Sequence, residues 1–325
     1  MAHTYAIGID VGATNTDIGM VRDDGAVIGR ANLSTSDYTD FRLYIGDVVR
    51  QMRDVMSFAA VYNIEGIGIG APNANYYTGC VVDAANLKMR GVLDFEKEIH
   101  RHINVPVAVS NDANAAAYGE MVFGGARGMN NFIMFTIGTG VGSGIVVNGQ
   151  LLHGVTGCAG ELGHSVLIPD GRQCTCGRKG CLEAYVSARG IVQTFCELRR
   201  EERFRTVEGA LIGESVADAD ITSKMIGAAA NGGDPVAMAT YEQTGRLLGI
   251  AMANSVCFSS PQAIFIMGGP AKVGEPLMKP LRKAFNENLL ATYRGSCDVY
   301  VSKLKENDAA ILGAAALVKA KKNRL

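Results

Sequence analysis

One histidine and three cysteines lie close together in the sequence: His164, Cys174, Cys176 and Cys181. Imidazole nitrogen and thiolate sulfur are ligands that Zn²⁺ prefers, and a complete set of four protein ligands leaves no open position for a substrate. Glycines among the cysteines allow a tight loop to form around an ion. The spacing therefore predicts a structural zinc site, and the alternative is a chance group of free thiols.

Two glutamates flank this segment, Glu161 and Glu183. A bound metal would hold the segment in one shape, so that both carboxylates could accept hydrogen bonds from adjacent hydroxyl groups of a sugar. The alternative for each glutamate is a surface acid that contacts only water.

Three glycine-rich turns follow apolar runs, at residues 10–14, 136–142 and 267–269. Glycine lets the backbone turn sharply and bring its N–H groups against a phosphate, and Thr14 and Thr139 can add hydroxyl donors. Asp10 ends the first apolar run, where a carboxylate is suited to Mg²⁺ or its water shell. A plain hairpin is the alternative for each turn taken alone. None of the three turns has the pattern of a P-loop or of a Rossmann dinucleotide site.

Asn111 and Asp112 stand where an apolar run meets an Ala-rich stretch that predicts a helix. One interpretation is an N-cap, which either residue type can provide. The other is catalytic, because a carboxylate at a helix N-terminus stays ionised and can accept the proton of an attacking hydroxyl group. Asn111 offers both a donor and an acceptor to a ring of hydroxyls.

The composition excludes several classes of protein. The chain has 325 residues, 48% of them hydrophobic and 19% charged, with a formal net charge of -1. It is too apolar for intrinsic disorder and lacks the basic field that would hold nucleic acid or an anionic membrane. No apolar run reaches the length of a membrane span, and the first ten residues lack the features of a signal peptide. We therefore expect a cytoplasmic protein without a nucleic-acid or membrane partner.

Apolar runs alternate with helical periodicity along the whole chain, which predicts an α/β protein. The strand, glycine turn and strand of residues 4–21 recur from Asn131 onward, which indicates a repeat. We expect two domains in contact across a cleft, a smaller one at 1–117 plus 309–325 and a larger one at 118–308. The predicted strands are 4–10, 17–21, 26–33, 64–70, 105–110, 132–137, 143–147, 262–267 and 297–302, and the predicted helices are 40–62, 95–103, one from 112, 184–203, 221–230, 235–258, 276–288 and 309–320.

Together these motifs resemble the ROK family (repressors, open reading frames, kinases) of the actin-like ATPase and sugar-kinase superfamily. The resemblance covers nearly the whole chain, and its most specific part is Glu161-x-Gly-His164 with Cys174-x-Cys176-Gly-x-x-Gly-Cys181-Leu-Glu183. It implies two actin-like, ribonuclease H-like domains with an interdomain cleft, and it implies ATP, Mg²⁺ and structural Zn²⁺ as bound groups. It also implies a homodimer or homotetramer.

The resemblance further assigns roles to individual residues. Asp112 matches the catalytic base, and the sugar contacts are Asn111, Asp112, Glu161, His164 and Glu183, with Asn86 as a further candidate that could equally serve a turn. The nucleotide-binding set is Asp10, Gly12, Thr14, Asn15, Gly138, Thr139, Gly140, Gly268 and Gly269. One departure is visible, since Pro270 stands where the third turn of the family often has another glycine.

The family contains kinases and transcriptional repressors, and the repressors carry a DNA-binding module before the first phosphate motif. Asp10 is the tenth residue here, so we expect a kinase. The expected reaction is ATP-dependent phosphorylation of a hexose at its 6-hydroxyl group, with glucose as the first candidate. Another aldohexose, N-acetylmannosamine or N-acetylglucosamine is the alternative substrate, and a sugar sensor with a degenerate site is the alternative without catalysis.

Overall fold

The computed structural model describes residues 3–57, 63–84, 86–205, 208–213 and 215–322. The chain divides into two compact units, Met1–Asn130 with Gly144–Gly160 and Ser302–Leu325, and Asn131–Ser143 with Glu161–Val301. These bounds differ from the expected ones at 117 and 309. Both positions fall inside continuous helices, α3 (Asp112–Phe123) and α10 (Glu306–Lys322), so the chain passes between the units beyond the helix ends instead.

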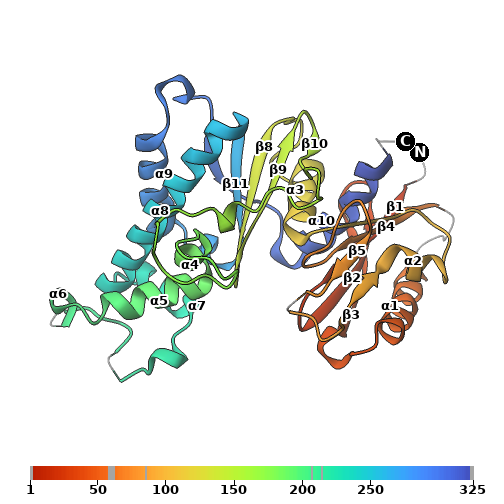
Figure 1. Ribbon diagram of the computed structural model, residues 1–325, viewed down its shortest axis with the longest axis horizontal. Helices are drawn as coiled ribbons and strands as arrows, with labels where there is room; N and C mark the ends of the chain where they lie inside the picture. The colour runs from red at the N-terminus through yellow and green to blue at the C-terminus, as the bar shows by residue number, and fades with distance from the viewer. Residues whose placement is uncertain (1–2, 58–62, 85, 206–207, 214, 323–325) are drawn as a thin grey trace. The chain divides into compact units, whose positions relative to one another are not determined.

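The first unit is built on a five-stranded sheet with the order β3-β2-β1-β4-β7 (Figure 1). Its strands are β1 (Tyr5–Val11), β2 (Asn15–Arg22), β3 (Val27–Ser34), β4 (Ile64–Gly70) and β7 (Val107–Ser110). β1, β2 and β3 form an antiparallel meander, whereas β4 and β7 run parallel to β1. The parallel strands therefore end at the same edge as β1.

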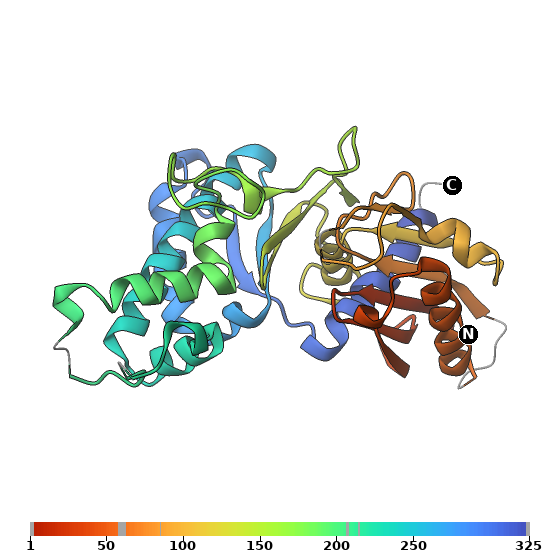
Figure 2. The same ribbon diagram turned by 60° about the horizontal axis from the view of Figure 1, so that its bottom comes forward.

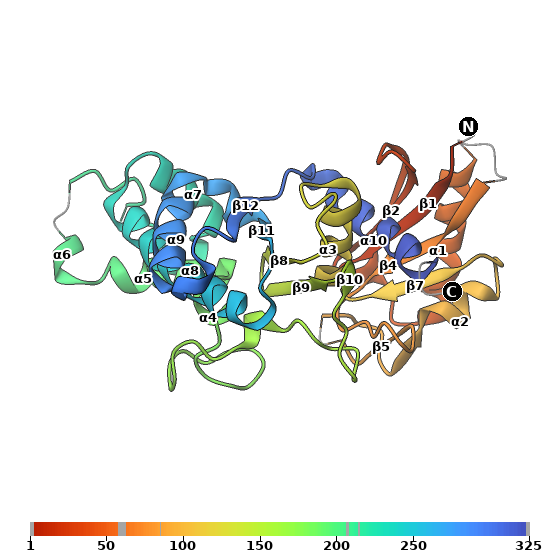
Figure 3. The ribbon, with the colours of Figure 1, turned by 90° about the horizontal axis from the view of Figure 1, so that it is seen from above.

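Helices cover both faces of this sheet (Figure 3). On one face, α1 (Phe41–Met56) and α2 (Phe95–His100) bury apolar side chains against Ile7 and Ile67. On the other face lies α10, with Ile311 and Ala315 in a second apolar cluster. α10 packs so closely that a Cβ atom on Gly68 would lie 1.8 Å from the Ala314 carbonyl oxygen. The absence of a side chain at Gly68 therefore allows α10 to pack against the strand.

The second sheet repeats the first in its strand order, β10-β9-β8-β11-β12. Its strands are β8 (Phe132–Ile137), β9 (Val141–Val147), β10 (Gln150–Leu151), β11 (Ala263–Met267) and β12 (Asp298–Val301). β10 is antiparallel to β9, and β11 runs parallel to both β8 and β12, as β4 does to β1 and β7. The predicted repeat and the α/β class are confirmed.

The helices of the second unit gather on one side of its strands (Figure 2). They are α4 (Glu183–Val186), α5 (Ala188–Leu198), α6 (Glu202–Arg205), α7 (Ser223–Asn231), α8 (Pro235–Ser259) and α9 (Glu275–Asn288). The single helix expected at 184–203 is divided because Ser187 adopts an extended backbone conformation and caps α5 through a hydrogen bond from the Gly190 N–H group.

Two further differences concern the first unit. The pair β5 (Cys80–Val82) and β6 (Val92–Asp94) was not predicted, because three-residue strands are too short to show periodicity. The helix expected at 40–62 ends at Met56, and residues 58–62 lie outside the described residues. Among the residues that the structure describes, no helix combines the length and apolar character needed to cross a membrane.

Candidate active site and metal centre

Two aspartates meet at the edge of the first sheet. Asp10 pairs with Gly70 in the parallel register of β1 and β4, and Gly70 pairs with Ser110 at the end of β7. Asp112 follows two residues later as the first residue of α3. A Cβ atom on Gly70 would lie 3.7 Å from both Asp10 Oδ1 and Asp112 Cα. Asp10 and Asp112 are therefore both neighbours of Gly70 at this edge of the sheet.

The surroundings of Asp10 favour its neutral form. Burial is the main cause that raises the pKa of Asp10 from 3.8 to about 7, and the negative charges of Asp112 and Asp17 contribute to the same rise. Asp17 lies opposite Asp10 in the hairpin register of β1 and β2. Three carboxylates around one position destabilise one another, and a divalent cation would relieve that repulsion. The donor set is thus suited to Mg²⁺, which prefers oxygen ligands.

Asn111 is the N-cap residue of α3. Its side-chain oxygen accepts a hydrogen bond of 3.0 Å from the Ala113 N–H group. Asp112 Oδ1 accepts from the same N–H group at 2.8 Å, while its side chain remains exposed. Desolvation by the surrounding protein raises the pKa of Asp112, and backbone N–H groups and Asn111 partly oppose that rise. Each carboxylate oxygen has two acceptor positions, so Asp112 can accept this N–H group and still accept a proton.

The first glycine turn joins β1 to β2 beside Asp10. The Gly12 N–H group donates to the Asn15 carbonyl at 2.9 Å, and the side chains of Thr14 and Asn15 are exposed. Behind the turn, the buried hydroxyl of Thr16 lies 2.7 Å from the hydroxyls of both Thr35 and Tyr44. This buried network anchors the end of the turn and leaves its tip open to a ligand.

The other two glycine turns lie side by side in the second unit. Thr136 pairs with Met267 where β8 and β11 end, so that residues 138–140 and 268–269 leave the sheet at the same edge. A Cβ atom on Gly268 would lie 2.0 Å from the Ile137 carbonyl oxygen. Pro270 is buried in the first turn of the 3₁₀ helix Gly269–Val273, where a missing N–H group breaks no helical hydrogen bond.

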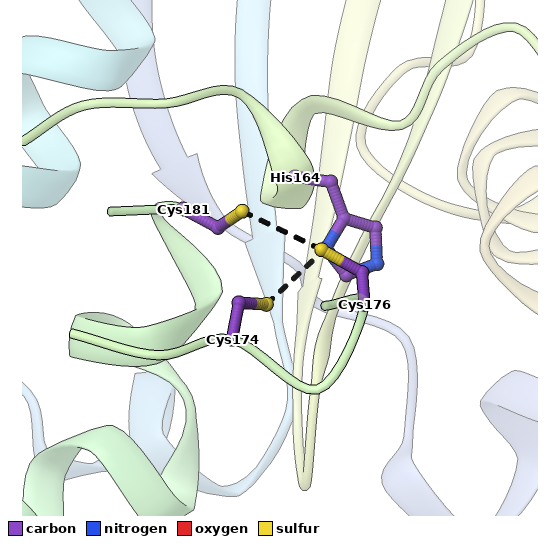
Figure 4. A group of neighbouring side chains, drawn as sticks. All are labelled: His164, Cys174, Cys176 and Cys181. Atoms are coloured by element: carbon purple, nitrogen blue, oxygen red, sulfur yellow. Dashed lines mark hydrogen bonds between the residues drawn. The ribbon is translucent and has the colours of Figure 1, made fainter. Parts of the chain in front are cut away.

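The four predicted zinc ligands come together in the second unit (Figure 4). Their donor atoms, one each from His164, Cys174, Cys176 and Cys181, all lie within 4.8 Å of one another. The Cys174 Sγ to His164 Nδ1 and Cys176 Sγ to Cys181 Sγ distances are both 3.6 Å. A tetrahedral ion with Zn–S bonds of about 2.3 Å separates its sulfur ligands by about 3.8 Å. The group therefore fits a tetrahedral Zn²⁺ ion.

The pKa values of two of these thiols are shifted in opposite directions, since burial raises the pKa of Cys181 to about 12. Hydrogen bonds from the backbone and side chain of Arg178 lower the pKa of Cys176 to about 6, which favours the thiolate that binds metal. His164 presents Nδ1 to the sulfurs, so its Nε2 lies on the opposite side of the ring. One imidazole can thus bind the metal and still face a second ligand.

The remaining predicted sugar contacts differ in their surroundings. Glu161 is exposed at the start of the 3₁₀ helix Leu162–His164, next to the metal ligand His164. Glu183 is buried, with 8% of its surface exposed, and its carboxylate accepts from Val141 N and Thr175 Oγ1, each at 2.9 Å. Asn86 lies exposed on the turn between β5 and β6, in a segment separate from the five-stranded sheet.

A pocket of about 550 Å³ opens in the second unit near the glycine turn. Arg189 belongs to its lining and donates through Nε to the Thr139 carbonyl at 3.3 Å. Other residues of the lining combine apolar surface with amide, carboxylate and hydroxyl groups: Val192, Gln193, Asp218, Ile221 and Thr222. No motif in the sequence predicts this pocket, because it forms from the faces of helices and the loop between them.

Comparisons with known proteins agree with this geometry. The ROK family model matches residues 6–321. A glucokinase from Halalkalibacterium halodurans is 32% identical over 329 residues, spanning 100% of this chain and 98% of that protein. A ROK family glucokinase from Streptomyces griseus, solved in complex with glucose and AMPPNP, has a TM-score of 0.79 and 30% identity, covering 97% of this chain and 99% of that one.

A transcriptional regulator is also similar. It is a ROK family homolog of the E. coli MLC protein, with a TM-score of 0.84 and 26% identity, covering 97% of this chain and 77% of that one. The fold is therefore common to kinases and regulators. In this chain the four predicted zinc ligands form one group of donor atoms. Because the family model matches almost the whole chain, the chain belongs to the ROK family.

Proposed function

We propose that this chain is an ATP-dependent glucokinase that transfers the γ-phosphoryl group of ATP to the 6-hydroxyl group of glucose. The observation that carries the proposal is the position of Asp112, which is exposed as the first residue of α3 and follows the N-cap residue Asn111. A sensor has no need of such a carboxylate. The similarity to proteins named glucokinase supports the choice of reaction and of sugar.

Asp112 acts as the general base. Its carboxylate accepts the proton of the 6-hydroxyl group as the oxygen attacks the γ-phosphorus, while the bond from that phosphorus to the bridging oxygen of ADP breaks. A base works best when its pKa lies near the working pH, and the raised pKa of Asp112 moves it in that direction. The NH₂ group of Asn111 has two hydrogens, so it can donate to Asp112 and also to a sugar hydroxyl, because the cap uses only the side-chain oxygen.

Asp10, with Asp17 and Asp112 beside it, would hold Mg²⁺ or its water shell. When bound, Mg²⁺ neutralises charge that develops on the phosphates. The exposed Thr14 and Asn15 offer hydroxyl and amide donors to phosphate oxygens, and Gly12 holds the turn through its hydrogen bond to the Asn15 carbonyl.

The second unit supplies the remaining nucleotide contacts. Gly138, Thr139 and Gly140 form the second phosphate turn, and Gly268 and Gly269 leave the sheet beside it. The pocket lined by Arg189 and Gln193 adjoins this turn and is large enough for a purine base. Its mixture of apolar and hydrogen-bonding groups is typical of a small-molecule site.

Zn²⁺ would be held by His164, Cys174, Cys176 and Cys181, and it would fix the segment that presents Glu161 and Nε2 of His164 to the sugar. Glu183 can still accept from a hydroxyl, because each carboxylate oxygen has two acceptor positions. The role of the ion would be structural, since four protein ligands leave no coordination site for a substrate.

A panel of sugars with ATP in a coupled assay of ADP release tests the proposal. Glucose should give the highest kcat/KM, and N-acetylmannosamine, N-acetylglucosamine and other aldohexoses are the competing substrates. Binding of glucose without ADP release, under conditions where ATP also binds, would favour a sensor. We also propose a homodimer or homotetramer, which light scattering of the purified protein tests.

A further inference from the structure

Glu183 connects the metal centre to the second phosphate turn. One carboxylate oxygen, Oε1, accepts a hydrogen bond of 2.9 Å from the hydroxyl of Thr175. The other, Oε2, accepts one of 2.9 Å from the Val141 N–H group, directly after the turn at residues 138–140. Because Glu183 is buried, its carboxylate has these two protein donors in place of water molecules. Each hydrogen bond therefore holds its donor in position.

Thr175 sits at the centre of the metal-binding loop. It is the residue between the ligands Cys174 and Cys176, and Cys174 Sγ itself lies 3.7 Å from Glu183 Oε1. An ion bound by both cysteines fixes the backbone on either side of Thr175. The direction of its hydroxyl group is then set by the metal, and without the metal the loop is free to change shape.

The phosphate turn rests on the same segment at several points. A Cβ atom on Gly140 would lie 2.6 Å from Glu183 Oε2, and one on Gly163, next to His164, would lie 2.0 Å from the Val141 carbonyl oxygen. The Gly138 carbonyl accepts from the Ala188 N–H group at 2.8 Å. Both peptide groups of Val141 thus face residues that lie beside metal ligands or follow them closely.

From these contacts we infer that Thr175 and Glu183 transmit occupancy of the zinc site to the phosphate turn, so that bound zinc increases affinity for the nucleotide. Thr175 is a positioning residue in this inference, since it acts through Glu183. The inference rests on the proposed function, which assigns residues 138–140 to the phosphates. By thermodynamic linkage, a nucleotide must tighten zinc binding by the same factor by which zinc tightens nucleotide binding.

Three variants test the coupling by binding, without turnover. Thr175→Val removes the hydroxyl at nearly constant volume, Thr175→Ser keeps it, and Thr292→Val makes the same change at an exposed residue of the second unit. Zinc content by elemental analysis and the Kd of ADP by calorimetry are measured for each. Zinc-loaded Thr175→Val should bind ADP about three- to tenfold more weakly, as expected for one hydrogen bond, whereas the other two should match the wild type.

The unmodified chain provides a second measurement that does not depend on a variant that folds. Competition with a chelator gives the zinc affinity with and without saturating ADP. We expect ADP to tighten zinc about three- to tenfold in the wild type and in Thr175→Ser, and much less in Thr175→Val.

ADP binding that is equally tight in Thr175→Val, or zinc affinity that ADP leaves unchanged, would overturn the inference. Such results would leave the proposed function intact if ADP still binds and glucose-dependent ADP release persists. Failure of the proposed function looks different, because the chain would then bind no ADP or would release none with any sugar.

Discussion

Asp10 and Asp112 both lie beside Gly70, at the edge where β1, β4 and β7 end, and a Cβ atom on Gly70 would lie 3.7 Å from Asp10 Oδ1 and from Asp112 Cα. The charge of Asp112 helps to raise the pKa of Asp10 to about 7, although burial contributes more. Their roles differ because their surroundings differ. Asp112 begins a helix whose N–H groups favour its charge, whereas Asp10 ends a strand with Asp17 opposite.

Replacing Asp112 by Asn should abolish turnover and spare the fold. Asn keeps the shape of the side chain but cannot accept a proton, and a positioned base typically contributes about 10²- to 10⁴-fold to the rate. We expect kcat to fall by about that factor while the KM for glucose changes little. Steady-state kinetics and the melting temperature check both parts. Near-normal turnover of Asp112→Asn would contradict the assignment of the base.

A neighbouring variant separates catalysis from capping. Asn111→Ala removes the side-chain acceptor for the Ala113 N–H group and should lower the free energy of unfolding by about 1 kcal/mol. Asp112→Asn should leave that free energy almost unchanged, since Asn111 still caps α3. Equal stability losses in the two variants would mean that Asp112 shares the cap.

The pKa of Asp10 predicts how stability depends on pH in metal-free protein. The folded state holds a proton on Asp10 up to about pH 7, whereas the unfolded state releases it near 3.8. Stability from this group is therefore fully present below 3.8 and is lost as the pH rises through 7. In EDTA, the stability of Asp10→Asn relative to the wild type should increase by about 3 kcal/mol from pH 5 to pH 8, since each pH unit between the two pKa values is worth about 1.36 kcal/mol. Urea unfolding at the two pH values measures the difference, and a constant difference would contradict it.

Most of the fold could be predicted from the sequence, because its strands and helices have long apolar patterns. The strands at 64–70 and 132–137 were predicted to the residue. The bounds of the two units were harder to predict from the sequence. They depend on the tertiary contacts of α3 and α10, which local sequence patterns do not indicate. The break at Ser187 was also missed, because a single extended residue separates α4 from α5.

The sequence predicted that His164, Cys174, Cys176 and Cys181 form one group, and the structure brings all four together. The roles of the other site residues stay predictions. Asp17 was not predicted, although counting the hairpin from its turn would have placed it opposite Asp10. Thr175 has no feature in the sequence beyond its place between two cysteines. Its hydrogen bond to Glu183 could not be predicted, because it depends on the burial of Glu183 in the folded structure.

Close packing of α10 predicts a large effect at Gly68. A Cβ atom there would meet the Ala314 carbonyl oxygen, so that Gly68→Ala must displace the helix and should cost about 3 kcal/mol of unfolding free energy. Gly46→Ala is the matched control, because a Cβ atom on Gly46 meets nothing within 4 Å and Ala is the better helix former. The control should be as stable as the wild type or more so. Similar losses in both variants would contradict the packing argument.

Purified protein should contain one zinc ion per chain. Cys181 is buried, and Cys181→Ser should lower both the zinc content and the melting temperature, because the ligand set is then incomplete. Cys257→Ser, at an exposed cysteine outside the group, should change neither. Elemental analysis with thermal unfolding measures both quantities. A stable and active protein without metal would end the prediction of a structural zinc.

Glu161 is expected to act in sugar binding rather than in the chemical step. Its exposed carboxylate begins the short helix that ends at His164, and a hydrogen bond to a sugar hydroxyl would be made equally in the ground state and the transition state. Glu161→Gln should therefore raise the KM for glucose about tenfold, as expected for the loss of a charged acceptor, with kcat within about twofold.

The control for this prediction is Glu287→Gln, which changes an exposed acid on α9 and should leave both constants unchanged. Comparison with Asp112→Asn then tests whether the two carboxylates have different roles, because Glu161→Gln should change KM and Asp112→Asn should change kcat. A fall in kcat without a change in KM for Glu161→Gln would place Glu161 in the chemical step, and the assignment of Asp112 as the base would then need revision.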